Sequence, residues 1–158
     1  MKALSKLLIP LLVLLGATAA HTQSPVYLSV EALGSGGLGS INVEKTWIDR
    51  SPWALQGRLG FSFLPIDANT GAALVFPLLL HGLYGPGDHR ADLGIGQALT
   101  LTTKGGLFAR MPLVAGYRWQ PRDRKVFVRV AYTPLVSYLV DFQWEHWGGI
   151  AIGYRINN

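Results

Sequence analysis

The chain contains no cysteine and is poor in charged residues. Because none of its 158 residues is a cysteine, the sequence can form no disulfide and no cysteine-containing metal motif. Charged residues make up 15% of the sequence, against roughly 25% in ordinary soluble domains. Mean hydropathy is +0.27. We therefore expect a fold that is stabilised by packing and hydrogen bonding alone and is more apolar than an ordinary soluble domain.

Long hydrophobic runs are absent beyond the N-terminus. Residues 1–20 contain Lys2 and Lys6, then the apolar run Leu7–Leu15, then small residues up to Ala20, which is the pattern of a secretory signal peptide. The apolar run is too short to cross a bilayer of about 30 Å as a helix. We predict a signal peptide at 1–20 and one domain at 21–158. An exported apolar chain without hydrophobic helices can satisfy its backbone in lipid only by closing a sheet on itself.

After residue 25, apolar and small or polar side chains alternate with a period of two, which is typical of β-strands. Turn clusters rich in Gly, Pro, Asn and Asp separate the alternating segments. The predicted strands are Val26–Leu33, Gly39–Trp47, Trp53–Phe63, Ala73–Leu83, Arg90–Thr102, Leu107–Gln120, Lys125–Leu139 and Trp144–Ile156. Ten-residue segments of this kind, even in number, predict an all-β fold: an eight-stranded antiparallel up-and-down transmembrane β-barrel.

The alternation does not by itself say which face is inside. In the last segment, Ile150 and Ile152 lie on one face, and Ala151 and Gly153 lie on the other. A soluble lipocalin-like binding barrel would have the same period with the apolar face inside. The second face carries too few charges for a water-exposed surface, which favours an apolar face toward lipid. Segment Ala73–Leu83 is apolar on both faces, so its orientation stays open.

Aromatic residues gather near the ends of the predicted strands. Membrane proteins place such residues at the two interfaces between lipid and water. The residues concerned are Trp47, Trp53, Tyr84, Trp119, Trp144 and Trp147.

Charged residues share the polar face of several segments. These residues are Glu31, Glu44, Arg58, Asp92, Arg118, Arg129 and Arg155. We expect this face to line the lumen, where unpaired charges are costly and paired charges are tolerated. The predicted role is a network of ion pairs across strands that plugs the barrel and leaves no continuous water path. The alternative is a charged pore or gate, which a lumen of only eight strands disfavours.

Signals of catalysis are weak. Ser137, Asp141 and His146 lie close in sequence, so a lipid-modifying enzyme remains an alternative, although no recognised nucleophile motif supports it. The four histidines are too widely spaced for a local metal motif. The pattern Gly34-x-Gly36-x-x-Gly39 matches a dinucleotide fingerprint by letter, but a strand pattern follows it where a helix is required. We predict no catalytic residue, no cofactor and no metal.

The chain resembles the small outer-membrane β-barrel proteins common in Bacteroidota. The resemblance spans the mature chain and rests on the segments 31–37, 41–44, 116–121, 128–135 and 153–155, which read EALGSGG, INVE, GYRWQP, VRVAYTPL and GYR. It implies a barrel fold and an outer-membrane location, and it carries no activity.

The remaining expectations concern location and partners. Removal of residues 1–20 would leave 12 basic and 9 acidic residues, which are spread thinly along the sequence and form no nucleic-acid footprint. We expect a monomer in the outer membrane, in contact with outer-membrane lipid. Its insertion would use the barrel-assembly machinery.

Overall fold

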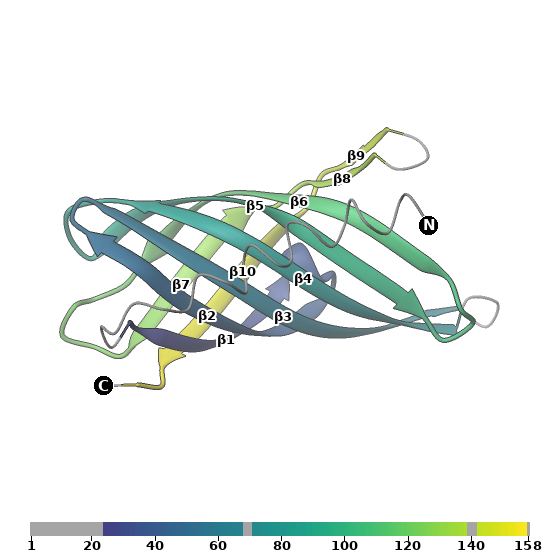
Figure 1. Ribbon diagram of the computed structural model, residues 1–158, viewed down its shortest axis with the longest axis horizontal. Helices are drawn as coiled ribbons and strands as arrows, with labels where there is room; N and C mark the ends of the chain where they lie inside the picture. The colour runs from purple at the N-terminus through teal and green to yellow at the C-terminus, as the bar shows by residue number, and fades with distance from the viewer. Residues whose placement is uncertain (1–23, 68–70, 139–141, 158) are drawn as a thin grey trace.

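The computed structural model describes residues 24–67, 71–138 and 142–157 (Figure 1). The predicted signal peptide, residues 1–20, lies outside this part of the chain. The described elements are β1 Val26–Leu33, the 3₁₀ turn η1 Gly34–Gly36, β2 Gly39–Arg50, β3 Trp53–Asp67, β4 Gly71–Tyr84, β5 His89–Thr102, β6 Leu107–Trp119, β7 Val126–Tyr132, β8 Leu135–Ser137, β9 Gln143–Glu145 and β10 Gly148–Arg155. Among the described residues, no helix is long and apolar enough to cross a membrane.

The strands close into one antiparallel barrel. Strand β1 pairs with β2 on one side and with β10 on the other, and the pairing of β5 with β6 completes the ring. Only two residues separate β7 from β8, and only two separate β9 from β10, so each of these pairs counts as one barrel strand. The ten strands of the described residues therefore make an eight-stranded barrel. Each barrel strand pairs with the next along the chain. The predicted eight-stranded antiparallel barrel is confirmed.

The last two predicted strands are each broken once, which the sequence did not indicate. The break between β7 and β8 falls at Thr133 and Pro134, and the backbone amide of Thr133 donates to the carbonyl of Trp147 across the second break, at 2.8 Å. Proline lacks the amide that would continue the ladder. The β8–β9 hairpin consequently leaves the line of the barrel wall (Figure 1).

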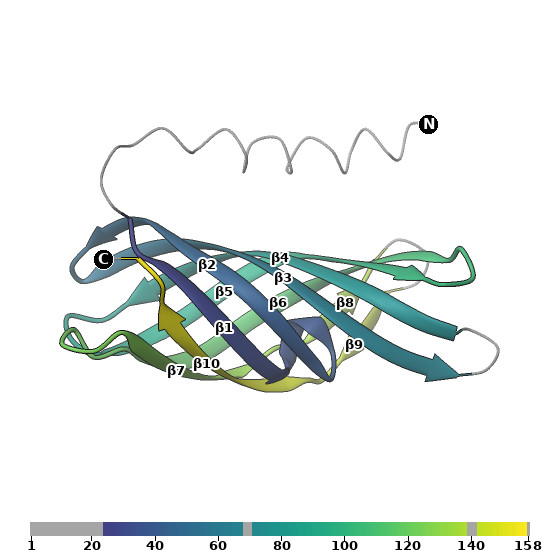
Figure 2. The same ribbon diagram turned by 90° about the horizontal axis from the view of Figure 1, so that it is seen from below.

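The topology gives the barrel two distinct ends. The start of β1, the end of β10 and the turns β2–β3, β4–β5 and β6–β7 lie at one end, here called the termini end (Figure 2). The turn η1 and the connections β3–β4, β5–β6 and β8–β9 lie at the other, here called the hairpin end. Every residue can therefore be assigned to an end from its strand and register.

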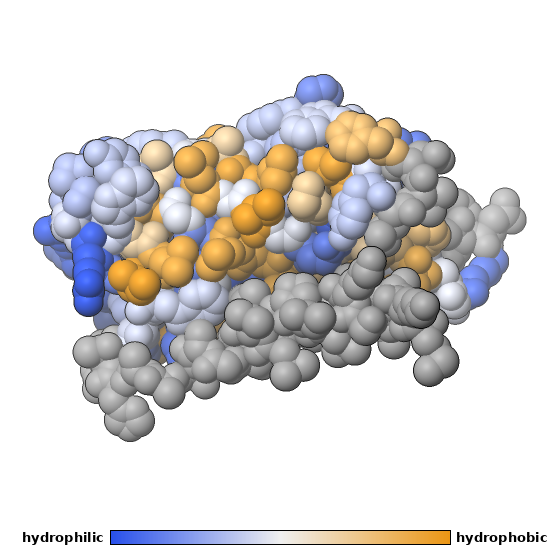
Figure 3. Space-filling view, turned by 45° about the horizontal axis from the view of Figure 1, so that its top comes forward, coloured by the Kyte–Doolittle hydropathy of each residue, from blue (hydrophilic) through white to orange (hydrophobic). Residues whose placement is uncertain are grey.

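The outer face of the barrel is apolar. Val30, Leu59 and Leu93 point outward and are 58%, 57% and 64% exposed. Figure 3 shows such side chains forming an apolar band over the wall, beside a hydrophilic termini end on the left. A soluble monomer rarely exposes a continuous apolar surface of this size. The apolar face is therefore outside and the polar face inside, as in a lipid-facing barrel and opposite to a lipocalin-like barrel.

Strand β4, whose orientation the sequence left open, presents its odd-numbered residues to the lumen. Leu79, His81 and Leu83 are all at most 1% exposed, whereas Leu78 and Leu80 on the opposite face are half-buried. Both faces are apolar because one meets the packed lumen and the other meets the outer surface.

Candidate functional site

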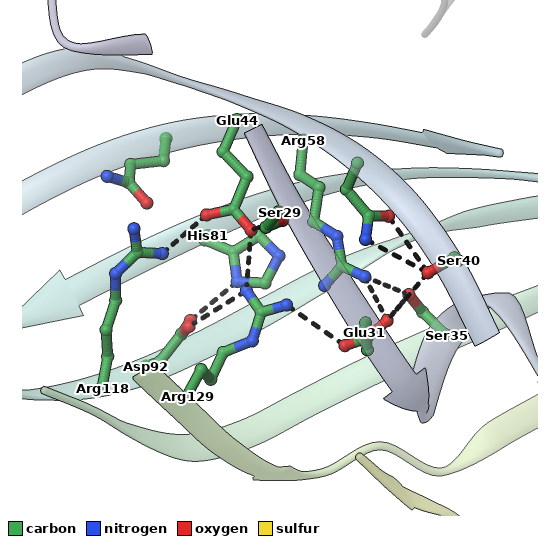
Figure 4. Close-up of polar contacts among 12 residues, drawn as sticks. Ser29, Glu31, Ser35, Ser40, Glu44, Arg58, His81, Asp92, Arg118 and Arg129 are labelled. Atoms are coloured by element: carbon green, nitrogen blue, oxygen red, sulfur yellow. Dashed lines mark hydrogen bonds and ion pairs between the residues drawn. The ribbon is translucent and has the colours of Figure 1, made fainter. Parts of the chain in front are cut away.

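The lumen contains a buried network of charged side chains (Figure 4). Its acidic members are Glu31, Glu44 and Asp92, and its basic members are Arg58, Arg118 and Arg129. Each is at most 5% exposed, and the six come from six different strands. Formal charges balance within this set. Six of the seven sequence-predicted residues are thus brought together in the middle of the barrel.

Arg129 on β7 is the centre of the network. Its Nη2 donates to Glu31 Oε1 at 3.1 Å, and its Nη1 lies 3.3 Å from Glu44 Oε1 and 3.7 Å from Asp92 Oδ2. One guanidinium therefore joins carboxylates from β1, β2 and β5. Such contacts cross the lumen and tie its walls together.

A second part of the network lies on the side of the middle that faces the hairpin end. Arg58 on β3 donates to Glu31 and also to Ser35 Oγ at 3.0 Å. Ser35 belongs to η1, which is buried and folds over the Glu31 carboxylate, to which Ser35 donates at 3.3 Å. A Cβ at Gly34 would lie 2.6 Å from Glu31 Cδ, and Gly34 has φ of +84°, so only glycine fits this turn. The glycine pattern that matches the dinucleotide fingerprint therefore forms a tight turn between β1 and β2.

Arg118 on β6 forms the part nearest the termini end. Its Nη1 donates to Glu44 Oε2 at 2.6 Å, and its guanidinium carbon lies 3.4 Å from the centroid of the Phe127 ring. Its Nε donates to Gln120 Oε1 at 2.8 Å, and Gln120 in turn donates to the Tyr27 hydroxyl at 2.6 Å. Arg118 is therefore held by a carboxylate, an amide and an aromatic face.

His81 is a member of the network that sequence reasoning missed. Its Nδ1 lies 2.7 Å from Asp92 Oδ1, and both residues are at most 1% exposed. The apolar character of both faces of β4 concealed which of its residues point inward. Once Leu79 and Leu83 are placed in the lumen, the period of two places His81 there as well.

Arg155 does not join the network as expected. It lies directly opposite the buried Tyr27 across the β1–β10 ladder and so shares the lumen face. Within the described residues, however, Arg155 forms no ion pair. Arg155 is the last residue of β10, and the carboxylate in the same register row, Glu44 on the other side of Tyr27, is held by Arg118 and Arg129.

The lumen between the network and the hairpin end is mostly apolar. A cavity of about 290 Å³ opens there, lined by η1 and by residues of β3, β4, β5, β6 and β8. At its rim, Arg110 and Glu145 form an ion pair of 2.6 Å. The charged network is thus confined to the middle of the barrel.

The three residues of the enzymatic alternative are not shown to converge. His146 bonds the Tyr132 hydroxyl through Nδ1 at 2.5 Å, and Ser137 lies opposite Gln143 in the β8–β9 hairpin. Asp141 lies outside the described residues. The Tyr132 hydroxyl also accepts from Trp144 Nε1 at 3.3 Å, so His146 belongs to an exposed aromatic cluster.

Comparisons with known proteins identify the fold. No protein-family model matches the chain, and no curated protein is similar to it. The N-terminal β-barrel domain of Pseudomonas aeruginosa OprF matches with a TM-score of 0.56 and 12% identity, over 83% of this chain and 95% of that domain. The chain has the fold of small outer-membrane β-barrels. The Yersinia pestis outer membrane protein Ail, determined in a phospholipid bilayer nanodisc, matches equally, with a TM-score of 0.56 and 12% identity over 85% of this chain and 100% of Ail. The finer resemblance to Bacteroidota proteins rests on the sequence motifs alone.

Proposed function

We propose that the protein is a small, monomeric outer-membrane β-barrel with a structural or interaction role, no catalytic activity and a lumen closed by its charged network. It would be exported by the signal peptide at residues 1–20 and inserted by the barrel-assembly machinery. The proposal rests on one observation: the outer wall is apolar, whereas the lumen contains buried charged side chains whose charges balance.

The apolar wall supports residence in lipid. A closed sheet has no unpaired edge, so its backbone groups are satisfied without water. Exposed aromatic residues lie toward both ends of the wall, such as Trp53 beside Tyr84 at the termini end and Trp144 at the hairpin end. This is the distribution that places aromatic rings at two lipid–water interfaces.

The lumen network supports closure rather than conduction. Arg58, Arg118 and Arg129 reach inward from the wall to carboxylates on other strands, and each is at most 2% exposed. Eight strands enclose a space that side chains can fill. A role at the membrane surface would then fall to the hairpins and the wall.

The proposal can be tested with the mature chain refolded in detergent and in planar bilayers. We expect unboiled and boiled samples to differ in gel mobility, as a folded barrel does, and we expect no steady ion conductance. The double variant R118A/R129A, which withdraws two guanidinium groups from the lumen, should introduce conductance, whereas V128L on the outer wall should not. Steady conductance of the wild-type protein would refute closure, and a chain that remains soluble and monomeric without detergent would refute membrane residence.

A further inference from the structure

Basic residues that are scattered in the sequence gather at one end of the barrel. The termini end carries Lys45, Arg50, Arg90, Arg122, Arg124, Lys125 and Arg155. Its acidic residues are Asp49, Asp88 and Asp123. Seven basic residues against three acidic ones give an excess of four positive charges at this end. Among its described residues the hairpin end has no such excess, since it carries Lys104 and Arg110 against Asp67 and Glu145, and Arg110 is paired with Glu145.

Several of these charges remain exposed and available. Arg50, Arg122 and Arg124 are exposed, and Arg124 lies 3.9 Å from Asp123, whereas Arg50 forms no ion pair within the described residues. The Nη2 atom of Arg122 donates to the carbonyl of Pro86 at 2.7 Å, and its backbone amide donates to Asp88 Oδ1 at 3.2 Å, but its guanidinium forms no ion pair within the described residues. The acidic residue Asp49 is engaged by the buried Arg90, at 3.4 Å.

The exposed basic residues lie next to the aromatic residues of the same end. Arg50 is the register partner of Trp53, whose ring centroid lies 4.5 Å from that of Tyr84. Trp53 and Tyr84 are 61% and 51% exposed on the outer wall. Aromatic rings of this kind mark the level of lipid headgroups. The long side chain of Arg50, beside Trp53 at this level, can extend its guanidinium to the phosphates.

We propose that the termini end binds the anionic headgroups of phospholipids in the leaflet that surrounds it, and that Arg50 and Arg122 are principal contacts. This inference rests on the proposed residence in the membrane. The favoured ligand is a phosphatidylglycerol-like headgroup, because its net negative charge complements the basic end whereas a zwitterionic headgroup does not. A basic residue near an anionic leaflet strengthens binding by about fivefold.

The test is a competition between two lipids with identical acyl chains. The mature barrel is equilibrated in mixed micelles of phosphatidylglycerol and phosphatidylcholine, and native mass spectrometry measures the ratio of the lipids that it retains. We expect the wild-type protein to retain phosphatidylglycerol preferentially. R50Q and R122Q should each lower that preference by about fivefold, and both together by more. The matched control K104Q removes an exposed charge from a turn of the hairpin end and should leave the preference unchanged.

Two results would overturn the proposal. One is equal retention of both lipids by the wild-type protein, and the other is an equal effect of R50Q and K104Q, which would mean that only total charge matters. A barrel that retains both lipids equally would still be a membrane protein. A chain that retains neither lipid and needs no detergent would instead contradict the proposed function.

Discussion

The substitution R129A tests the lumen network at its centre. Arg129 contacts Glu31, Glu44 and Asp92, so its removal leaves three buried carboxylates facing two guanidinium groups. Breaking a buried ion pair typically costs about 3–5 kcal/mol. Because Glu31 keeps its ion pair with Arg58, and Glu44 keeps its ion pair with Arg118, we expect the free energy of unfolding to fall by an amount near the lower end of this range, about 3 kcal/mol.

The assay is urea unfolding of the refolded barrel in lipid vesicles, followed by tryptophan fluorescence. The matched control V128L changes the neighbouring, outward-facing residue and should shift stability by less than about 0.5 kcal/mol. The double variant R129A/D92N removes one negative charge as well, so it should be less destabilised than the sum of its single substitutions. If R129A unfolds at the same urea concentration as V128L, the network does not stabilise the barrel and the reasoning fails.

Two further predictions use the same unfolding assay. G34A should lower the free energy of unfolding by about 1–3 kcal/mol, because a side chain there meets the Glu31 carboxylate and must adopt positive φ. The control G87A, where nothing lies within 4 Å, should lower it by less than about 0.5 kcal/mol. Equal effects of the two substitutions would refute the role of the turn. H81A should cost about 1–3 kcal/mol, because it leaves Asp92 Oδ1 without its 2.7 Å partner; unchanged stability would show that the pair contributes nothing.

The sequence predicts the barrel well where one face of a strand is polar. Strands β1 and β2 alternate around Glu31 and Glu44, and β6 alternates from Pro112 onward, so Glu31, Glu44 and Arg118 could be placed in the lumen from the period alone. Strand β4 could not be oriented, because Leu78 and Leu79 are equally apolar although one faces out and one faces in. For the same reason His81 was missed.

The partners within the lumen could not be predicted from local pattern. Arg129 and Glu31 are 98 residues apart, and their contact depends on closure of the barrel and on the register of several strands. Arg155 likewise has the predicted phase, but the carboxylate in its register row, Glu44, is engaged by Arg118 and Arg129 from other strands. The gathering of basic residues at one end likewise appears only when the turns are placed, since neighbours at that end come from separate parts of the sequence.

The central claim is that the apolar face meets lipid and the charged face fills the lumen. Because the chain has no cysteine, single cysteines can carry spin labels without background. V30C lies on the outer wall, at a position 58% exposed, and A98C lines the cavity of about 290 Å³ at the hairpin end. In lipid vesicles, the label at position 30 should collide with membrane-dissolved oxygen far more than with a water-soluble nickel chelate, and the label at position 98 should show lower oxygen accessibility. A label at position 30 that is reached more readily by the nickel chelate than by oxygen would contradict the account.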